Sequence, residues 1–150
     1  MSLPVRYPVE PMEAESADEL PSRPGWLFEP KWGGFRCLAF RDGDSIRIQS
    51  KAGKPLTRYF PDVVALLESL GARRFVLDGE IVIPVDGRLS FDDLLQRIHP
   101  AASRINKLAN QTPASLIVFD LLAPTGTTIS ESSTNCFTLS DFTAPTTSGK

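Results

Sequence analysis

The chain has 150 residues, a formal net charge of -2 and 41% hydrophobic residues. This length supports one modest domain with a real hydrophobic core, and the composition is ordinary for a globular protein. The charge balance excludes the global basic field that is typical of many nucleic-acid-binding proteins. Two cysteines, Cys37 and Cys136, are too few for a disulfide framework or a cysteine-rich metal cluster. Because the chain has neither a signal-peptide core nor a long apolar stretch, we expect a cytoplasmic protein, and we take a monomer as the simplest oligomeric state.

Residues 1–26 are rich in proline and acidic residues, with prolines at positions 4, 8, 11, 21 and 24. Proline fixes the backbone and removes a hydrogen-bond donor, so these positions prevent long regular elements. We therefore predict an extended N-terminal lead-in over residues 1–26, with one short helical turn around residues 13–20.

From Phe35 onward the pattern favours β-structure and then a helix. Two β-favouring runs, residues 35–41 and 44–50, flank Asp42-Gly43, which predicts a hairpin. Residues 61–70 predict a helix, because a proline suits its first turn, apolar residues share one face and Gly71 fits just past its end.

The predicted elements after this helix are a strand, a turn, two helices and a strand. They lie at residues 75–83, 86–87, 90 onward, 100–110 and 115–122, in that order. The first of the two helices begins with a capping-box-like pair, Ser90 and Asp93. After Pro124 about half of the residues are serine or threonine and no periodicity is visible. We predict an organised domain over residues 27–124 and a tail over residues 125–150 that is disordered or out of frame.

The segment EPKWGGFR, residues 29–36, places Lys31 where its amine could act as a covalent nucleophile. Because lysine has a pKa near ~10.4, a site must lower that pKa by desolvation or nearby positive charge. The Gly33-Gly34 pair lets the backbone approach a ligand, and Arg36 could hold a phosphate group. The alternative interpretation is a strand end with an exposed lysine and a glycine turn.

Two other segments carry candidate binding residues. Asp78 and Glu80 share one face of an apolar strand, where buried carboxylates need a cation, a donor or a metal. Glu80 could accept hydrogen bonds from a ribose or help to hold a divalent metal, and Phe119 could stack on a flat base. The alternatives are a solvent-facing or ion-paired carboxylate pair beside a turn glycine, and a core phenylalanine. His99 offers no partner in sequence, so we predict a structural role for it.

Four segments in this order, EPKWGGFR, SKAGK (50–54), DGE (78–80) and FDLL (119–122), closely resemble the ATP-dependent DNA ligases. The nearest likeness is to bacterial stand-alone repair ligases and to the ligase domains of end-joining enzymes. The resemblance runs from about Pro4 to Leu122. It implies an α+β fold, an ATP-grasp-like nucleotidyltransferase (adenylation) domain of mixed antiparallel sheets with flanking helices, here incomplete. Residues 27–124 would then be a partial adenylation domain.

The resemblance also implies roles for individual residues. Lys31 would attack the α-phosphate of ATP, expel pyrophosphate and become a lysyl-AMP. The implied ATP-binding positions are Glu29, Arg36, Lys51, Glu80 and Phe119. Arg36 would contact a nucleotide or DNA phosphate, Glu80 would bind the ribose hydroxyls and is the one candidate metal ligand, and Phe119 would stack on adenine. The implied cofactors are ATP and Mg²⁺ (or Mn²⁺), and the implied partner is nicked double-stranded DNA in repair and recombination.

The chain departs from the family pattern in two places. Gly33 stands where the family has an aspartate, and no segment after Leu122 resembles the family's further glutamate motif, its lysine pair or its OB-fold domain. We therefore expect a truncated adenylation-domain fragment whose catalysis is impaired. Two rival interpretations are a non-catalytic ATP- or DNA-binding module and a gene fragment without a function of its own.

Overall fold

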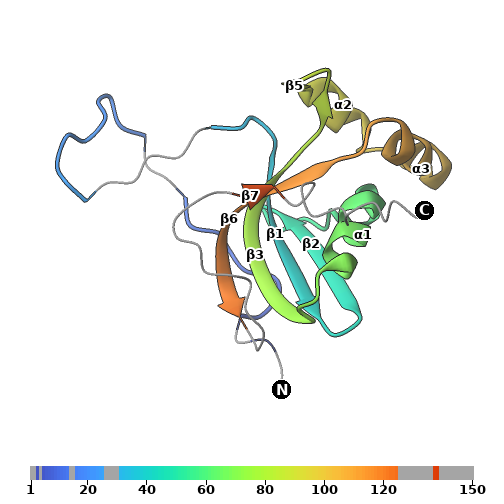
Figure 1. The fold of residues 1–150 in the computed structure, drawn as a ribbon, viewed down its shortest axis with the longest axis horizontal. Coiled ribbons are helices and arrows are strands. Elements are labelled where there is room, and N and C mark those ends of the chain that lie inside the picture. Colours follow the sequence, from blue (N-terminus) through green and yellow to red (C-terminus); the bar gives the residue numbers. More distant parts are fainter. Residues whose placement is uncertain (1–2, 4, 14–15, 26–30, 125–136, 139–150) are drawn as a thin grey trace, which may run out of the picture.

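The computed structural model describes residues 3, 5–13, 16–25, 31–124 and 137–138. Its centre is a five-stranded antiparallel sheet in the order β2-β1-β3-β6-β7 (Figure 1). The strands are β1 (Phe35–Asp42), β2 (Ser45–Ser50), β3 (Arg74–Val82), β6 (Ser115–Pro124) and β7 (Phe137–Thr138). The helices are a 3₁₀ turn η1 (Thr57–Tyr59), α1 (Pro61–Ser69), α2 (Phe91–Gln96) and α3 (Ala102–Gln111). This α+β arrangement agrees with the fold class implied by the sequence.

Two hairpins form at the predicted Asp-Gly turns. Gly43, between β1 and β2, has a φ of +65°, a left-handed conformation that glycine adopts without steric cost. The second hairpin joins β4 (Pro84–Val85) to β5 (Arg88–Leu89), and both central residues have positive φ, +49° at Asp86 and +75° at Gly87. Positive φ at both central positions is the signature of the tight turn that matches strand twist.

The main hydrophobic core lies between the sheet and the helices. α1 contributes Val63 and Leu67, and the preceding Phe60 is also fully buried. They pack with the inward-facing residues of the sheet, which include Cys37, Ala39, Ile48, Phe75, Leu77, Ile81, Leu116 and Val118. α1 lies alongside the sheet, whereas α2 and α3 gather beyond one end of it (Figure 1). Cys37 is buried in this core, and burial raises the pKa of its thiol well above the ordinary value.

The N-terminal lead-in packs against the opposite face of the sheet. Its apolar residues at every second position, Leu3, Val5, Tyr7 and Val9, cover a small cluster formed by Leu38, Phe40 and Val76. The buried Gln49 fastens this segment, because its side chain accepts from Val9 N–H at 3.1 Å and donates to Val9 O at 2.6 Å. The described residues of this segment form no helix or strand, and Leu3, Val5, Tyr7 and Val9 make it an integral layer of the fold.

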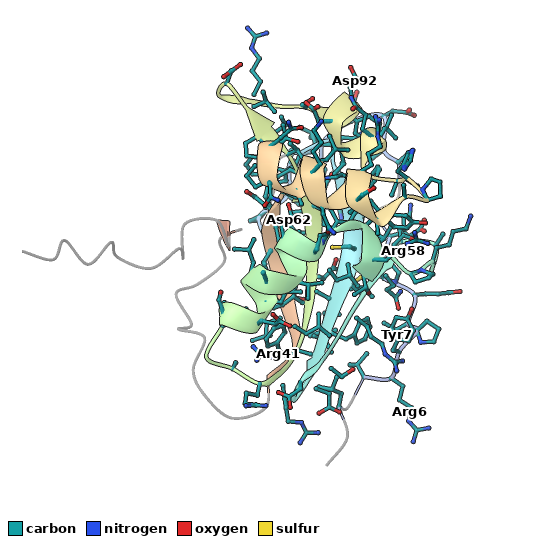
Figure 2. All side chains as sticks on the ribbon, turned by 90° about the vertical axis from the view of Figure 1, so that its right-hand side faces the viewer. Arg6, Tyr7, Arg41, Arg58, Asp62 and Asp92 are labelled. Atoms are coloured by element: carbon teal, nitrogen blue, oxygen red, sulfur yellow. The ribbon has the colours of Figure 1, made fainter. Side chains whose placement is uncertain are left out.

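The C-terminal end of α1 is closed by a side chain from the sheet. Arg41, which is 7% exposed, donates from its Nη1 atom to the carbonyl oxygens of Leu67, Glu68 and Leu70 (Figure 2). These are the carbonyls that a helix end leaves without partners. Gly71 follows the helix but has no positive φ, so it does not provide a left-handed cap.

A fully buried arginine joins the helices to the start of β6. Arg97 follows α2, and its Nη1 donates to Asp62 Oδ1 at 3.1 Å and to Tyr59 O at 3.2 Å. Its Nη2 donates to Asp62 Oδ2 and to Thr112 O. The same Asp62 oxygen accepts from Ala114 N–H at 2.6 Å. One carboxylate on α1 therefore fixes the positions of α2 and of the strand that carries Phe119.

Two observations complete the fold. Phe137 and Thr138 pair with Val118 and Ile117 of β6, although the tail has no strand periodicity in sequence. The other tail residues lie outside the described part of the chain. Within the described residues, every helix is too short or too polar to cross a membrane.

Candidate nucleotide-binding site

The sequence-predicted site residues gather where β1 begins. Arg36 on β1 is the register partner of Glu80 on β3, and Lys51 N–H donates to Arg36 O at 3.1 Å. The Arg36 guanidinium carbon lies 5.4 Å from the centre of the Phe119 ring on β6. Segments that are far apart in sequence thus supply one cluster at one end of the sheet. Glu29 lies outside the described residues.

Asp78 and Glu80 lie on the same face of β3, as strand alternation predicts. This face is the one that carries Val76 and is covered farther along by the N-terminal segment. Asp78 is buried, at 7% exposed, and Glu80 is half-buried. Glycine 79 between them does not make a turn: β3 continues through it without a break. A Cβ at Gly79 would lie 2.3 Å from Ile117 O, so only glycine fits where β3 and β6 approach each other.

The segment that follows Lys31 is held to β3 by Glu80. Glu80 Oε1 accepts a hydrogen bond from Gly34 N–H. A Cβ at Gly34 would lie 2.2 Å from Ile81 O, which explains the need for glycine there. Gly33 has a φ of +70°, and a Cβ there would meet no heavy atom within 4 Å, so a side chain has space at this position but would adopt a left-handed backbone conformation that favours glycine. Lys31 itself is exposed.

Arg36 is held by Asp78 in a bidentate ion pair. Arg36 Nε lies 2.6 Å from Asp78 Oδ1, and Nη2 lies 2.7 Å from Oδ2. The hydrogen bond with Asp78 raises the pKa of Arg36, against a smaller opposing effect of burial. The interpretation of Asp78 as an ion-paired carboxylate is therefore confirmed, and its partner is a residue that the resemblance assigns to phosphate binding.

Phe119 owes its position to a β-bulge. Val118 pairs with Gly79, but Asp120 pairs with Asp78, so Phe119 is the extra residue on β6. A bulge bends the strand and redirects the side chain, and such irregularities are common beside functional sites. The ring is half-buried rather than a full member of the core, as the base-stacking interpretation requires.

The remaining predicted positions lie at the edges of the cluster. Lys51 is exposed and pairs with Glu13 of the N-terminal segment at 3.2 Å. His99 Nδ1 accepts from Ala101 N–H at 3.0 Å, which agrees with a structural role. Among the described residues no three His, Cys, Asp or Glu side chains come together to hold a metal. A single carboxylate such as Glu80 suits Mg²⁺ only if nucleotide phosphates and water provide the other oxygens.

Comparison with known proteins identifies the family. The chain is 52% identical over 128 residues to DNA ligase C1 of Mycolicibacterium smegmatis, covering 82% of this chain and 37% of that protein. It is also 52% identical over 123 residues to DNA ligase C of Mycobacterium tuberculosis, with coverages of 82% and 34%. The chain therefore spans about a third of the length of these relatives.

A solved structure of mycobacterial DNA ligase D, complexed with ATP and MES, is 32% identical with a TM-score of 0.49, and the match covers 63% of this chain and 28% of that one. The family model for the ATP dependent DNA ligase domain matches residues 11–136, which include every site segment described above. The chain belongs to the ATP-dependent DNA ligase domain family.

Proposed function

We propose that the cluster at the start of β1 binds ATP, and that the chain contributes the nucleotide-binding part of a DNA ligase adenylation domain. The observation that carries this proposal is the convergence of Arg36, Glu80 and Phe119 beside the Lys31 segment. A half-buried aromatic ring, a carboxylate and a lysine are the groups that a base, a ribose and a phosphate chain need. Arg36, Glu80 and Phe119 come together through strand pairing and not through sequence proximity.

In the proposed complex, adenine stacks on Phe119 and the ribose hydroxyls donate to Glu80. Lys31 then faces the α-phosphate. In adenylation, a bond forms between Lys31 Nζ and the α-phosphorus, the bond from that phosphorus to the bridging oxygen breaks, and pyrophosphate leaves while the amine releases its proton to solvent. Such displacement depends mainly on positioning and charge neutralisation. Bound Mg²⁺ or Mn²⁺ would supply neutralisation of phosphate charge, with Glu80 as its one protein ligand in this cluster.

We further propose that this chain binds ATP better than it reacts with it. Lys31 is exposed, so the described residues do not enclose its amine. Gly33 carries no side chain where the family has a carboxylate, and loss of one preorganised group costs on the order of 10²–10³ in rate by analogy with an oxyanion-hole donor. These two features favour the non-catalytic ATP-binding alternative over full ligase activity. Nicked DNA as the partner and a cytoplasmic location stay predictions from the resemblance and the sequence.

Incubation with α-labelled ATP and Mg²⁺, followed by intact-mass and peptide analysis, tests the chemistry. We expect little or no covalent AMP on Lys31, and the Lys31→Ala variant defines the background. A stoichiometric adduct that Lys31→Ala abolishes would contradict the claim of impaired catalysis while supporting the site. Equilibrium binding of ATP without an adduct is the expected result.

A further inference from the structure

We propose that Arg36 is a positioning residue for Phe119: Asp78 clamps the guanidinium against one face of the ring, and adenine takes the other face. The inference rests on the proposed ATP site and deepens it. It differs from the role that the resemblance implies, in which Arg36 contacts a phosphate. Three observations support it, one each on Arg36, Asp78 and Phe119.

The Nε and Nη2 atoms of the Arg36 guanidinium already have hydrogen-bond partners. Its Nε and Nη2 atoms form the two parallel bonds to Asp78, at 2.6 and 2.7 Å, and Nη2 also lies 3.5 Å from Met12 O. This Nε/Nη2 edge is one of the two edges of a guanidinium that fit a carboxylate or a phosphate bidentately, the other being Nη1/Nη2. Because Asp78 occupies the Nε/Nη2 edge, Arg36 cannot offer the same edge to a phosphate without breaking the pair.

Breaking the pair is disfavoured by burial. The Asp78 side chain is 9% exposed, whereas that of Arg36 is 34% exposed. A carboxylate so deeply buried depends on its cation, because an unpaired buried charge is costly. Asp78 therefore holds Arg36 in place more firmly than a surface partner would, and the guanidinium keeps a fixed orientation.

The fixed guanidinium lies against the ring of Phe119, whose orientation the strand pairing does not determine. Phe119 is the extra residue of a β-bulge, so strand pairing alone does not set its direction. The guanidinium carbon is 5.4 Å from the ring centre, within the range of a cation–π contact. A ring has two faces, and a base that stacks on Phe119 takes the face that Arg36 leaves. The contacts that run from Asp78 through Arg36 to Phe119 thus set the plane on which the base lies.

Binding of three probes separates this role from phosphate binding. The probes are ATP, adenosine and inorganic triphosphate, titrated into the unaltered chain, Arg36→Met and Arg36→Lys. We expect both variants to weaken ATP and adenosine by the same factor, between about two- and tenfold, the range that a cation–π contact of ordinary strength can transmit. Arg36→Lys keeps the charge but lacks the planar fork, so it should not rescue adenosine binding. In a Phe119→Leu background the effect of Arg36→Met on adenosine should vanish.

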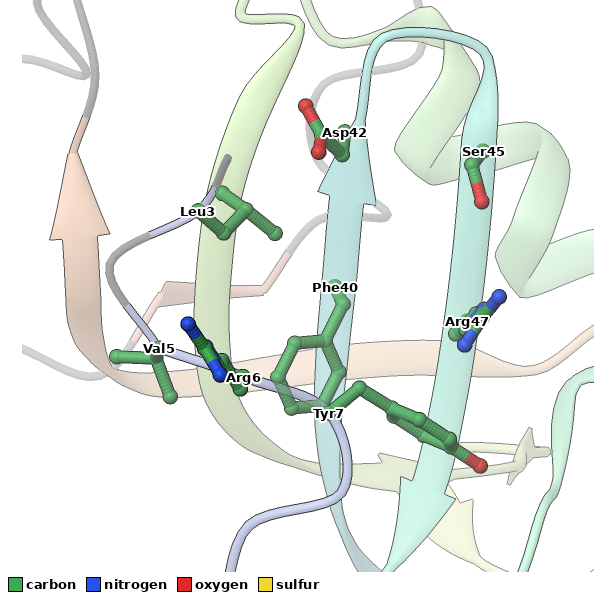
Figure 3. A pocket seen from close by; sticks show the side chains of 8 residues that line it. All are labelled: Leu3, Val5, Arg6, Tyr7, Phe40, Asp42, Ser45 and Arg47. Atoms are coloured by element: carbon green, nitrogen blue, oxygen red, sulfur yellow. The ribbon is translucent and has the colours of Figure 1, made fainter. Parts of the chain in front are cut away.

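A matched control is Arg47→Met. Arg47 lies over Tyr7 with its guanidinium carbon 5.1 Å from the ring centre, but this pair lines a separate cavity of about 370 Å³ with Phe40, Asp42 and Ser45 (Figure 3). Removal of this second arginine–aromatic contact should leave affinity for all three probes unchanged. An equal loss in Arg47→Met would overturn the inference, because the effect would then be one of general stability.

Other outcomes decide between the proposals. If Arg36→Met weakens ATP and triphosphate but spares adenosine, Arg36 is a phosphate ligand, and the inference fails while the proposed function stands. If the unaltered chain binds none of the probes, the proposed function fails. The contact between Arg36 and Phe119 can then still be tested by nuclear magnetic resonance spectroscopy. The Phe119 ring should shift the Arg36 Nε–H resonance upfield. Phe119→Leu should remove that shift, and an unchanged resonance would overturn the inference independently of nucleotide and of the folding of Arg36 variants.

Discussion

Replacing Asp62 with alanine should destabilise the domain more than any single change to a surface ion pair. Arg97 is fully buried, and Asp62 is the acidic partner of its guanidinium. Asp62→Ala leaves that cation with backbone carbonyls and the face of Phe60, whose ring centre lies 5.4 Å away. It also removes the acceptor for Ala114 N–H, which bonds to Asp62 at 2.6 Å.

The expected magnitude follows from the burial of the pair. Removal of one partner from a buried ion pair costs about 3–5 kcal/mol, because the other charge stays in a poorly solvated place. A lost hydrogen bond at Ala114 adds roughly 1 kcal/mol. Since domains of this kind are stable by only about 5–15 kcal/mol, the variant should lose a large share of its free energy of unfolding.

Denaturant unfolding followed by circular dichroism measures this loss. The matched control is Asp44→Ala, which removes the partner of Arg73 from a pair whose side chains are 94% and 62% exposed. We expect the control to change the free energy of unfolding by less than about 1 kcal/mol. A loss below 1 kcal/mol for Asp62→Ala, or equal losses in the two variants, would refute the argument that burial makes the Arg97 pair important.

Three further predictions concern the site and its support. Gly34→Ala should destabilise the segment that follows Lys31, because the new Cβ would lie 2.2 Å from Ile81 O. Gly33→Ala has room and should cost only the roughly 1–2 kcal/mol of a left-handed residue, and hydrogen exchange of the two variants compares them. Arg41→Met should lower stability by about 1–3 kcal/mol, measured by thermal unfolding, since it leaves carbonyls at the end of α1 without donors, and an unchanged midpoint would contradict this role. Burial raises the pKa of Cys37, so its contribution to stability is fully present below the unfolded pKa near ~8.5 and is lost as the pH rises toward the folded value. Unfolding free energies should therefore fall above about pH 8.5 by up to ~1.4 kcal/mol per pH unit, and Cys37→Ala should flatten that slope, whereas an identical slope would show that Cys37 is not responsible.

Local signals in the sequence were sufficient for most of the secondary structure. Asp42-Gly43 and Asp86-Gly87 mark turns because the required positive φ is a property of the turn residues themselves. Ser90 caps α2 as predicted, accepting from Asp93 N–H at 3.3 Å. In each case the determining residues are within a few positions of one another.

The features that could not be predicted depend on contacts between distant segments. Arg41 donates hydrogen bonds to the C-terminal carbonyls of α1 from 26 or more residues away, and the sequence of the helix contains no signal for these contacts. The glycine at position 79 resembles a turn residue in sequence, but its role is set by the approach of β6. The bulge at Phe119 and the clamp of Arg36 by Asp78 likewise arise from strand register. Apolar alternation over residues 3–9 was the available signal for the N-terminal layer, and the prolines obscured it.

Titration of ATP into the unaltered chain and into Phe119→Leu tests the central claim most directly. We expect measurable ATP binding by the unaltered chain. We also expect a loss of about 5- to 100-fold in Phe119→Leu, because stacking of a base on an aromatic ring contributes about 1–3 kcal/mol. Equal affinity in the two proteins would contradict the assignment of Phe119 as the base-stacking residue. An unaltered chain that binds no ATP would contradict the site as a whole.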